Sequence, residues 1–243
     1  MFIAQAYSAK DDGFKVAERT AELCEQTGLK SELAYSFLHR ARTFFLTGEY
    51  DRSLELIGEG EARLREAEHR GDLAVALQNR AMVHFYQGKI LEAVSGMEEA
   101  FELQGEDTAP FHQVQTSMML SFMYLEIEQI EKAKTQAHRA LELAEKYGAT
   151  QFIPMIQEAC GKVAQAEGDL DKAAEWYQVS ANSWDFFGNV YQYADQLHLL
   201  SRVLLLKGQP EEALKFTASA ARLWEGRAMT HAIPSTLTTA SRT

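Results

Sequence analysis

A turn motif recurs along this chain at a fixed interval, and the interval limits the folds that the chain can adopt. The segments "TGEYDRSLELI" from Thr47, "QGKILEAVSGM" from Gln87 and "EGDLDKAAEWY" from Glu167 align with one another. The central turn positions lie 40 residues apart, at Gly48, Gly88, Glu128, Gly168 and Gly208. Self-similarity at a period of this length is typical of repeat architectures, in which each unit packs mainly on its neighbours.

Small residues flank every turn at constant offsets. Five residues after the turn positions stand Ser53, Ala93, Ala133, Ala173 and Ala213, and seven residues before them stand Ala41, Ala81, Ser121, Gly161 and Ser201. Two antiparallel helices can touch along their length only where the facing side chains are small. Glycine in the turn allows the first helix to end, and an acidic residue just after it favours the start of the second. The pattern therefore predicts a series of helix hairpins.

These features resemble the tetratricopeptide repeat family, whose hairpins carry a small residue in the first helix, Gly-Asp-Tyr at the turn and Ala in the second helix. The stretches 48–50, "GEY", and 168–170, "GDL", match this pattern, and the resemblance covers about residues 30–227. The period is 40 residues, against about 34 in the family. The family's first-helix tryptophan is replaced by Phe37, Leu77, Ser117, Gln157 and Leu197. About six extra residues add roughly one and a half helical turns to each hairpin.

Variants with this longer period are similar to the helical-repeat sensor domains of large bacterial transcription activators of the maltose-regulon type. The resemblance implies an all-α fold, a right-handed superhelical array of antiparallel helix hairpins (an α-solenoid). We expect a partial first hairpin over residues 1–28, five repeats over 29–227 and a disordered Ser/Thr-rich tail over 228–243. No G-x-x-x-x-G-K-[ST] phosphate loop occurs in the sequence, so the nucleotide-binding module of those activators is missing from it.

Charge and hydropathy argue against nucleic acid and membrane as direct partners. The net charge is −11, from 24 basic and 35 acidic residues, and the two kinds are interspersed without a basic stripe. The longest apolar clusters, such as "VLLLKG", fall far short of the roughly 20 residues that a membrane span needs. Cys24 and Cys160 lie far apart without a C-x-x-C partner. They are expected to be buried thiols of a cytoplasmic protein, because disulfides are rare in reducing compartments.

The sequence offers no pattern for catalysis. Its seven histidines form no H-E-x-x-H pair and no His/Cys cluster, and no G-x-S-x-G elbow occurs. Pairs of acids are numerous, but they stand where a solvated helix face or a helix start is expected. We therefore expect no enzymatic activity, no cofactor and no metal. His39 and His198 are the histidines expected to face a groove.

The candidate binding surface follows from the helical register. Positions three residues before, one after and four after each first-helix small residue turn to the side that lines the concave face in the tetratricopeptide family. The expected groove residues are Leu38, Arg42, Phe45, Gln78, Met82, Phe85, Met118, Phe122, Lys162, His198 and Arg202. Methionine and phenylalanine together suit an adaptable groove that accepts a helix.

Two alternatives stay open for these residues. Phe45 and Phe85, and Leu125 at the same repeat position, can instead pack between successive first helices. The shared phase of Arg42, Lys162 and Arg202 suits the binding of a carboxylate, but solvated side chains that balance the acidic surface would show the same spacing.

The leading functional hypothesis is a non-enzymatic interaction module that binds a peptide or helix of a partner protein in its concave groove. The alternative is a ligand-sensing or signal-peptide-sensing domain of a larger bacterial transcription regulator. The last predicted helix carries apolar side chains at Leu214, Phe216, Leu223 and Trp224. Such a surface predicts pairing with a second copy through the C-terminal hairpin, or continuation into a further domain.

Overall fold

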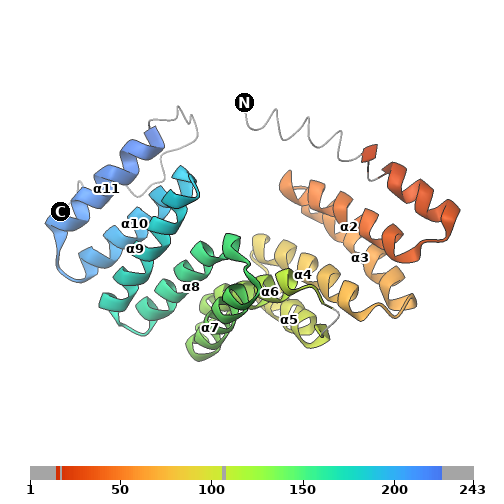
Figure 1. The fold of residues 1–243 in the computed structure, drawn as a ribbon, viewed down its shortest axis with the longest axis horizontal. Helices are drawn as coiled ribbons and strands as arrows, with labels where there is room; N and C mark the ends of the chain where they lie inside the picture. The colour runs from red at the N-terminus through yellow and green to blue at the C-terminus, as the bar shows by residue number, and fades with distance from the viewer. Residues whose placement is uncertain (1–14, 17, 106–107, 226–243) are drawn as a thin grey trace. The chain divides into compact units, whose positions relative to one another are not determined.

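The computed structural model describes residues 15–16, 18–105 and 108–225, and all regular structure in this part of the chain is helical (Figure 1). The chain divides into an N-terminal unit, Met1–Gln129, and a C-terminal unit, Ile130–Thr243. The all-α fold expected from the sequence is confirmed. Residues 1–14 and the tail at 228–243, on which the expected domain limits depend, lie outside the described residues.

In the N-terminal unit, residues 18–27 are helical and are followed by five longer helices. These are α2 (Lys30–Leu46), α3 (Tyr50–Glu66), α4 (Arg70–Tyr86), α5 (Ile90–Leu103) and α6 (Pro110–Glu126). The hairpins α2–α3 and α4–α5 pack closely, and α2 also contacts α4, which in turn contacts α6. The first helices α2, α4 and α6 are therefore neighbours, although their sequences are 40 residues apart.

In the C-terminal unit, the short 3₁₀ helix η1 (Thr150–Phe152) lies between the first two α-helices. The α-helices are α7 (Ile130–Tyr147), α8 (Ile153–Ala166), α9 (Leu170–Phe186), α10 (Val190–Leu206) and α11 (Pro210–Glu225). The hairpins α8–α9 and α10–α11 pack as closely as those of the N-terminal unit, and α9 also packs on α10. The expected hairpin arrangement is thus found in both units.

The turns explain why the helices have nearly equal lengths. Left-handed backbone occurs at Gly28, Gly48, Glu68, Gly88, Glu128, Gly148, Gly168, Gly188 and Gly208. At the first hairpin turn, the N–H of Gly48 donates to the carbonyl of Phe45 at 3.0 Å, and the N–H of Glu49 donates to that of Phe44 at 2.9 Å. This pair of bonds closes a helix end only when the turn residue adopts positive φ. The structure thus adds, between hairpins, a second set of turns like those that the sequence predicted within them.

The regular 20-residue spacing of the turns is interrupted after α5. This helix has 14 residues instead of 17, and Gln104 continues it in extended backbone with ψ of 130°. The Gln104 amide donates to Thr116 Oγ1 at 2.6 Å, and the Gln113 amide donates to the Thr108 carbonyl at 3.0 Å. Because these bonds tie the loop to α6, the next first helix still begins in register at Pro110.

Glu68 offers a direct test of the turn geometry. It is exposed and holds φ at 57°, where a Cβ is unfavourable. Glu68→Gly is expected to raise the free energy of unfolding by about 1 kcal/mol, because glycine adopts this conformation without strain. Urea denaturation followed by circular dichroism measures the change. Glu55→Gly, at an exposed position in the interior of α3, should instead destabilise by about 0.5–1 kcal/mol. Equal effects of the two changes would contradict the turn assignment.

Within each unit, the small residues lie at the helix contacts, as predicted. All ten are buried. The Ser53 hydroxyl of α3 donates to the Ala41 carbonyl of α2 at 2.8 Å. At Gly161 in α8 the partner is large, since the ring of Tyr177 fills the space that a Cβ would occupy. Close approach of the paired helices therefore depends on matched side-chain sizes, not only on small ones.

Candidate functional site

A cleft opens on the first helices of the N-terminal unit. Its walls come from α2, α4 and α6, and Ser53 and Ile57 of α3 form part of its floor. The cleft encloses about 360 Å³ and is open to solvent. This size falls within the range of ligand sites, and it also suits a few side chains of a bound peptide.

The 40-residue register places equivalent side chains along the cleft. Tyr35 of α2, Val75 of α4 and Gln115 of α6 occupy the same repeat position, and each lines the cleft. His39 and Asn79 share a second position, and Arg42 and Met82 share a third. Residues spaced by four and then three along a helix lie on one face. The constant 40-residue spacing therefore orients the same face of each first helix toward the cleft.

Of the predicted groove residues, the cleft brings together Leu38, Arg42, Phe45 and Met82. Arg42 is exposed, Phe45 and Met82 are half-buried, and Leu38 is buried within the cluster that also contains Ile57 and Leu77. The exposed and half-buried members are available to a partner, whereas Leu38 supports the wall.

The other predicted residues lie outside this cleft. Gln78 and Met118 are buried, with 2% of each residue exposed, and Phe85 and Phe122 are half-buried. In the C-terminal unit, Lys162 of α8 and His198 of α10 are half-buried, and Arg202 of α10 is exposed. A groove that combines residues of both units stays a prediction.

Sequence reasoning missed several cleft residues. Tyr35, Asn79, Phe111 and His112 were not among the expected groove positions, and His39 was expected there only as a histidine. Helical spacing could have identified two of them, because Tyr35 and His39 stand seven and three residues before Arg42 and so share its face. Phe111 gives no comparable signal, because the equivalent positions 31 and 71 carry serine and glycine.

The Tyr35 end of the cleft is rich in hydrogen-bonding groups and lies beside the Asp72 carboxylate. The Tyr35 hydroxyl donates to Asp72 Oδ1 at 2.7 Å, and burial and this carboxylate both raise the pKa of the phenol. His69 Nδ1 lies 3.5 Å from the other Asp72 oxygen. Burial lowers the pKa of His112, although Asp72 opposes the shift, and His112 Nδ1 has no hydrogen-bond partner in the structure. His112 is therefore neutral at pH 7.

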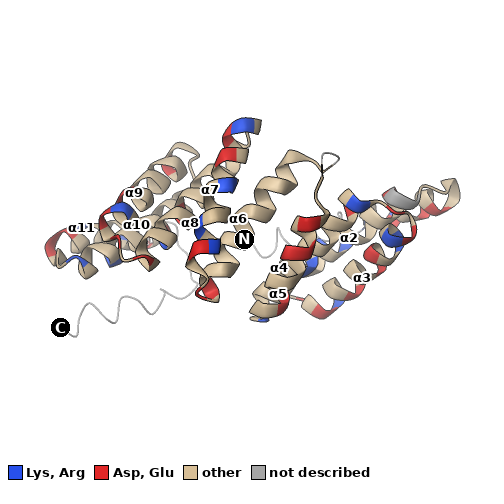
Figure 2. Ribbon diagram, turned by 90° about the horizontal axis from the view of Figure 1, so that it is seen from below, with Lys and Arg blue, Asp and Glu red and all other residues tan. Residues whose placement is uncertain are grey.

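The matching face of the C-terminal unit is more acidic. Lys162 Nζ lies 2.8 Å from Glu158 Oε1, and the Gln196 amide donates to Glu158 Oε2 at 2.7 Å. Burial and the Glu158 charge raise the pKa of Asp195. Figure 2 shows acidic and basic residues interspersed on the same helices, in agreement with the sequence. The charge of Lys162 is thus largely balanced by its own helix.

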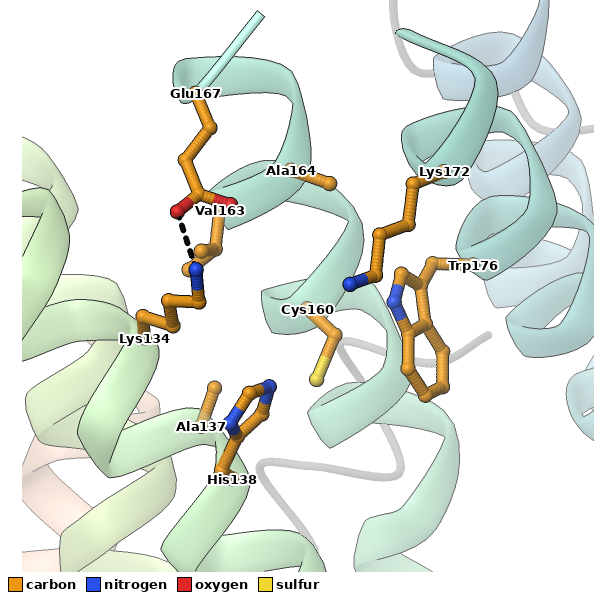
Figure 3. A pocket seen from close by; sticks show the side chains of 9 residues that line it. All are labelled: Lys134, Ala137, His138, Cys160, Val163, Ala164, Glu167, Lys172 and Trp176. Atoms are coloured by element: carbon orange, nitrogen blue, oxygen red, sulfur yellow. Dashed lines mark hydrogen bonds and ion pairs between the residues drawn. The ribbon is translucent and has the colours of Figure 1, made fainter. Parts of the chain in front are cut away.

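A second hollow surrounds Cys160 but offers no site. It holds about 10 Å³ between α7, α8 and α9, room for about one water molecule. Figure 3 shows the thiol directed toward the His138 ring, and Lys134 Nζ is paired with Glu167 Oε1 at 2.6 Å. Burial raises the pKa of Cys160 to about 11, although Lys172 lowers it somewhat. The thiol is therefore protonated at neutral pH and a poor nucleophile. Cys24 is likewise buried and free, so the expectation of two buried thiols is confirmed.

Residues 15–16, 18–105 and 108–225 lack two further kinds of functional feature. No group of three or more His, Cys, Asp or Glu side chains in this part of the chain could hold a metal ion. None of the helices described there is both long and apolar enough to cross a bilayer.

The fold has known counterparts among solved structures. BtubC (BKLC) from P. vanneervenii is similar with a TM-score of 0.75 and 16% identity, over 93% of this chain and 95% of that one. A protein of Podospora anserina with nearly identical TPR-like repeats is similar with a TM-score of 0.64 and 18% identity, over 80% of this chain and 95% of that one.

A peptide complex is also among the similar structures. The Rap conjugation gene regulator of plasmid pLS20, in complex with the Phr* peptide, has a TM-score of 0.63 and 17% identity, over 83% of this chain and 56% of the regulator. No protein-family model and no curated protein matches the sequence. The structural likenesses establish a TPR-like helical-repeat fold, as the sequence predicted.

Proposed function

We propose that this chain is a non-enzymatic interaction module whose N-terminal cleft binds a peptide segment of a partner protein. The observation that carries the proposal is the cleft itself, an open and mainly apolar surface formed by three successive first helices. A peptide complex of a similarly folded regulator supports it. A cytoplasmic location is part of the proposal and fits the two free cysteines.

Exposed apolar side chains border the cleft. Leu46 is 70% exposed and Phe111 is 45% exposed, and both line the cleft together with the half-buried Met82 and Phe45. Large apolar groups that cluster at the surface normally mark a binding site, because their contact with water is unfavourable. Polar groups at Tyr35, His39 and Asn79 would then orient the bound segment.

A second candidate function uses the same cleft. Its volume falls in the range of small-ligand sites, so a domain that senses a small molecule or signal peptide for a larger regulator is consistent with it. The similar regulator is also longer, since this chain spans 56% of its length. Saturation of the cleft by a small molecule that excludes peptides would favour this alternative.

Two equally exposed leucines provide a matched test of peptide binding. Leu46 lines the cleft, whereas Leu91 on α5 lies in a different surface hollow, and each is 70% exposed. Peptides selected from a displayed library on the wild-type protein should bind Leu46→Glu about tenfold more weakly, because an apolar contact is replaced by a charge. Leu91→Glu should bind them as the wild type does. Fluorescence anisotropy gives the dissociation constants.

One result would contradict peptide binding in the cleft. If the selected peptides bind Leu46→Glu and Met82→Glu as tightly as the wild type, the cleft is not their site. Circular dichroism of each variant shows that the helices are intact.

A further inference from the structure

The cleft differs in charge from the rest of the protein. Arg42 is the only charged side chain among the described residues that line it, and no Asp or Glu is among them. The whole chain carries 35 acidic and 24 basic residues. A surface without carboxylates is therefore unusual in this protein, and it favours anionic ligands over cationic ones.

Arg42 is also available for bonding. Within the part of the chain that the structure describes, no carboxylate lies within ion-pair distance of it, although the equivalent Lys162 is paired with Glu158 at 2.8 Å. The Arg42 side chain is exposed at the cleft mouth. Its guanidinium presents several donors in a fixed plane, which matches the geometry of a carboxylate.

The surroundings of Arg42 favour a mixed apolar and acidic ligand. Phe45, Leu46 and Met82 line the cleft next to it, so a bound apolar side chain would exclude water and strengthen an ion pair. Asp72 lies at the other end, where it accepts from the Tyr35 hydroxyl. Tyr35 and Arg42 are about 10 Å apart along the helix axis. Repulsion by Asp72 therefore directs an anionic group toward Arg42.

We propose that the cleft selects an acidic amphipathic segment of a partner protein. A large apolar side chain packs on Phe45, Leu46 and Met82, and a neighbouring Asp or Glu side chain pairs with Arg42. The carboxylate comes from a side chain rather than a chain end, because the cleft extends past Arg42 toward both Leu46 and Tyr35. This inference rests on the proposed function and adds the class of peptide.

A synthetic peptide array tests the charge preference. Short peptides with blocked ends are made in three versions, with Asp, Asn or Lys next to a central Phe. The wild-type protein should bind the best Asp peptides about tenfold more tightly than their Asn versions, the size of one charge-assisted hydrogen bond. Lys versions should bind most weakly, and rising salt should reduce the Asp advantage.

Variants assign the preference to one side chain. Arg42→Gln should bind Asp and Asn versions equally, and Arg42→Glu should prefer the Lys versions. The matched control is Arg70→Gln, which removes the same charge from an exposed arginine of α4 that does not line the cleft. It should keep the Asp preference of the wild type.

The outcomes separate this inference from the proposed function. Peptides that bind through Leu46 but show equal affinity in their Asp and Asn versions would overturn the charge preference and leave peptide binding in place. An Asp preference that persists in Arg42→Gln would also overturn the inference. Peptides that require a free C-terminal carboxylate would overturn the choice of a side-chain acid. A cleft that binds no peptide would overturn both proposals.

Discussion

Gly161→Ala is expected to lower the free energy of unfolding of the C-terminal unit by about 2 kcal/mol, within the range for overpacked cores. A Cβ at this position would lie 2.7 Å from Tyr177 Cε1 and 2.8 Å from Cδ1. The tyrosine is fully buried, and its hydroxyl bonds to Gln165 Oε1 at 3.0 Å. The ring therefore cannot move aside without loss of packing. Urea denaturation followed by circular dichroism measures the change.

Gly58→Ala is the matched control. Gly58 is also a helical glycine, in α3, but no atom lies within 4 Å of the Cβ that alanine would add. Alanine there should stabilise by about 0.5–1 kcal/mol, because glycine weakens a helix interior. A double variant of Gly161→Ala with Tyr177→Leu should lose less stability than the sum of the single changes. A Gly161→Ala protein as stable as the wild type would show that α8 and α9 do not approach this closely.

The hairpin architecture was predictable because short sequence segments determine each hairpin and recur along the chain. A turn needs a residue that tolerates positive φ, and a close helix pair needs small side chains. The residue types at Gly48 and Ala41 therefore indicate a turn and a helix contact by themselves. The matching of sizes across a pair was not predictable in the same way. Tyr177 opposite Gly161 can be recognised only when the contact between the two helices is known.

The cleft was predictable only in part, because a helix with several neighbours has more than one covered face. The register selected Arg42, Phe45 and Met82, and these three side chains line the cleft. It also selected Gln78, which is buried, since the sequence alone does not show how far the neighbouring helices cover that face. Phe111 reaches the cleft from a third helix, and the equivalent positions 31 and 71 carry serine and glycine, so the repeat gives no signal for it.

The N-terminal unit contains a buried acid, Glu61, that the sequence analysis did not single out. Glu61 of α3 is 5% exposed, and its Oε2 lies 2.8 Å from Arg80 Nη1 of α4. Arg80 also reaches Glu99 of α5 at 3.7 Å, and Arg65 lies 3.3 Å from the same Glu99. Burial raises the pKa of Glu61, and Arg80 is the strongest of the charges that lower it. The ion pair thus offsets part of the free-energy cost of burying the Glu61 charge where α3, α4 and α5 meet.

Arg80→Met is expected to destabilise the N-terminal unit by about 3 kcal/mol at pH 7, because it leaves the Glu61 charge buried without its partner. Without Arg80 the pKa of Glu61 rises further. A carboxyl with a raised pKa in the folded state contributes stability that is present below its unfolded pKa and lost as pH rises through the folded value. The deficit of the variant should therefore shrink as pH falls from 7 toward 5. Urea denaturation at several pH values measures this trend.

Two further variants separate the buried charge from lost packing. Glu61→Gln combined with Arg80→Met should recover most of the stability at pH 7, because no buried charge remains. Arg19→Met breaks an ion pair with Glu22 whose side chains are 65% and 54% exposed, and it should cost less than about 1 kcal/mol. If Arg80→Met loses the same stability at pH 5 as at pH 7, and the double variant recovers none of it, the role of Arg80 lies in packing. The Glu61 charge would then have to be stabilised by Arg65, the other cation that lowers its pKa.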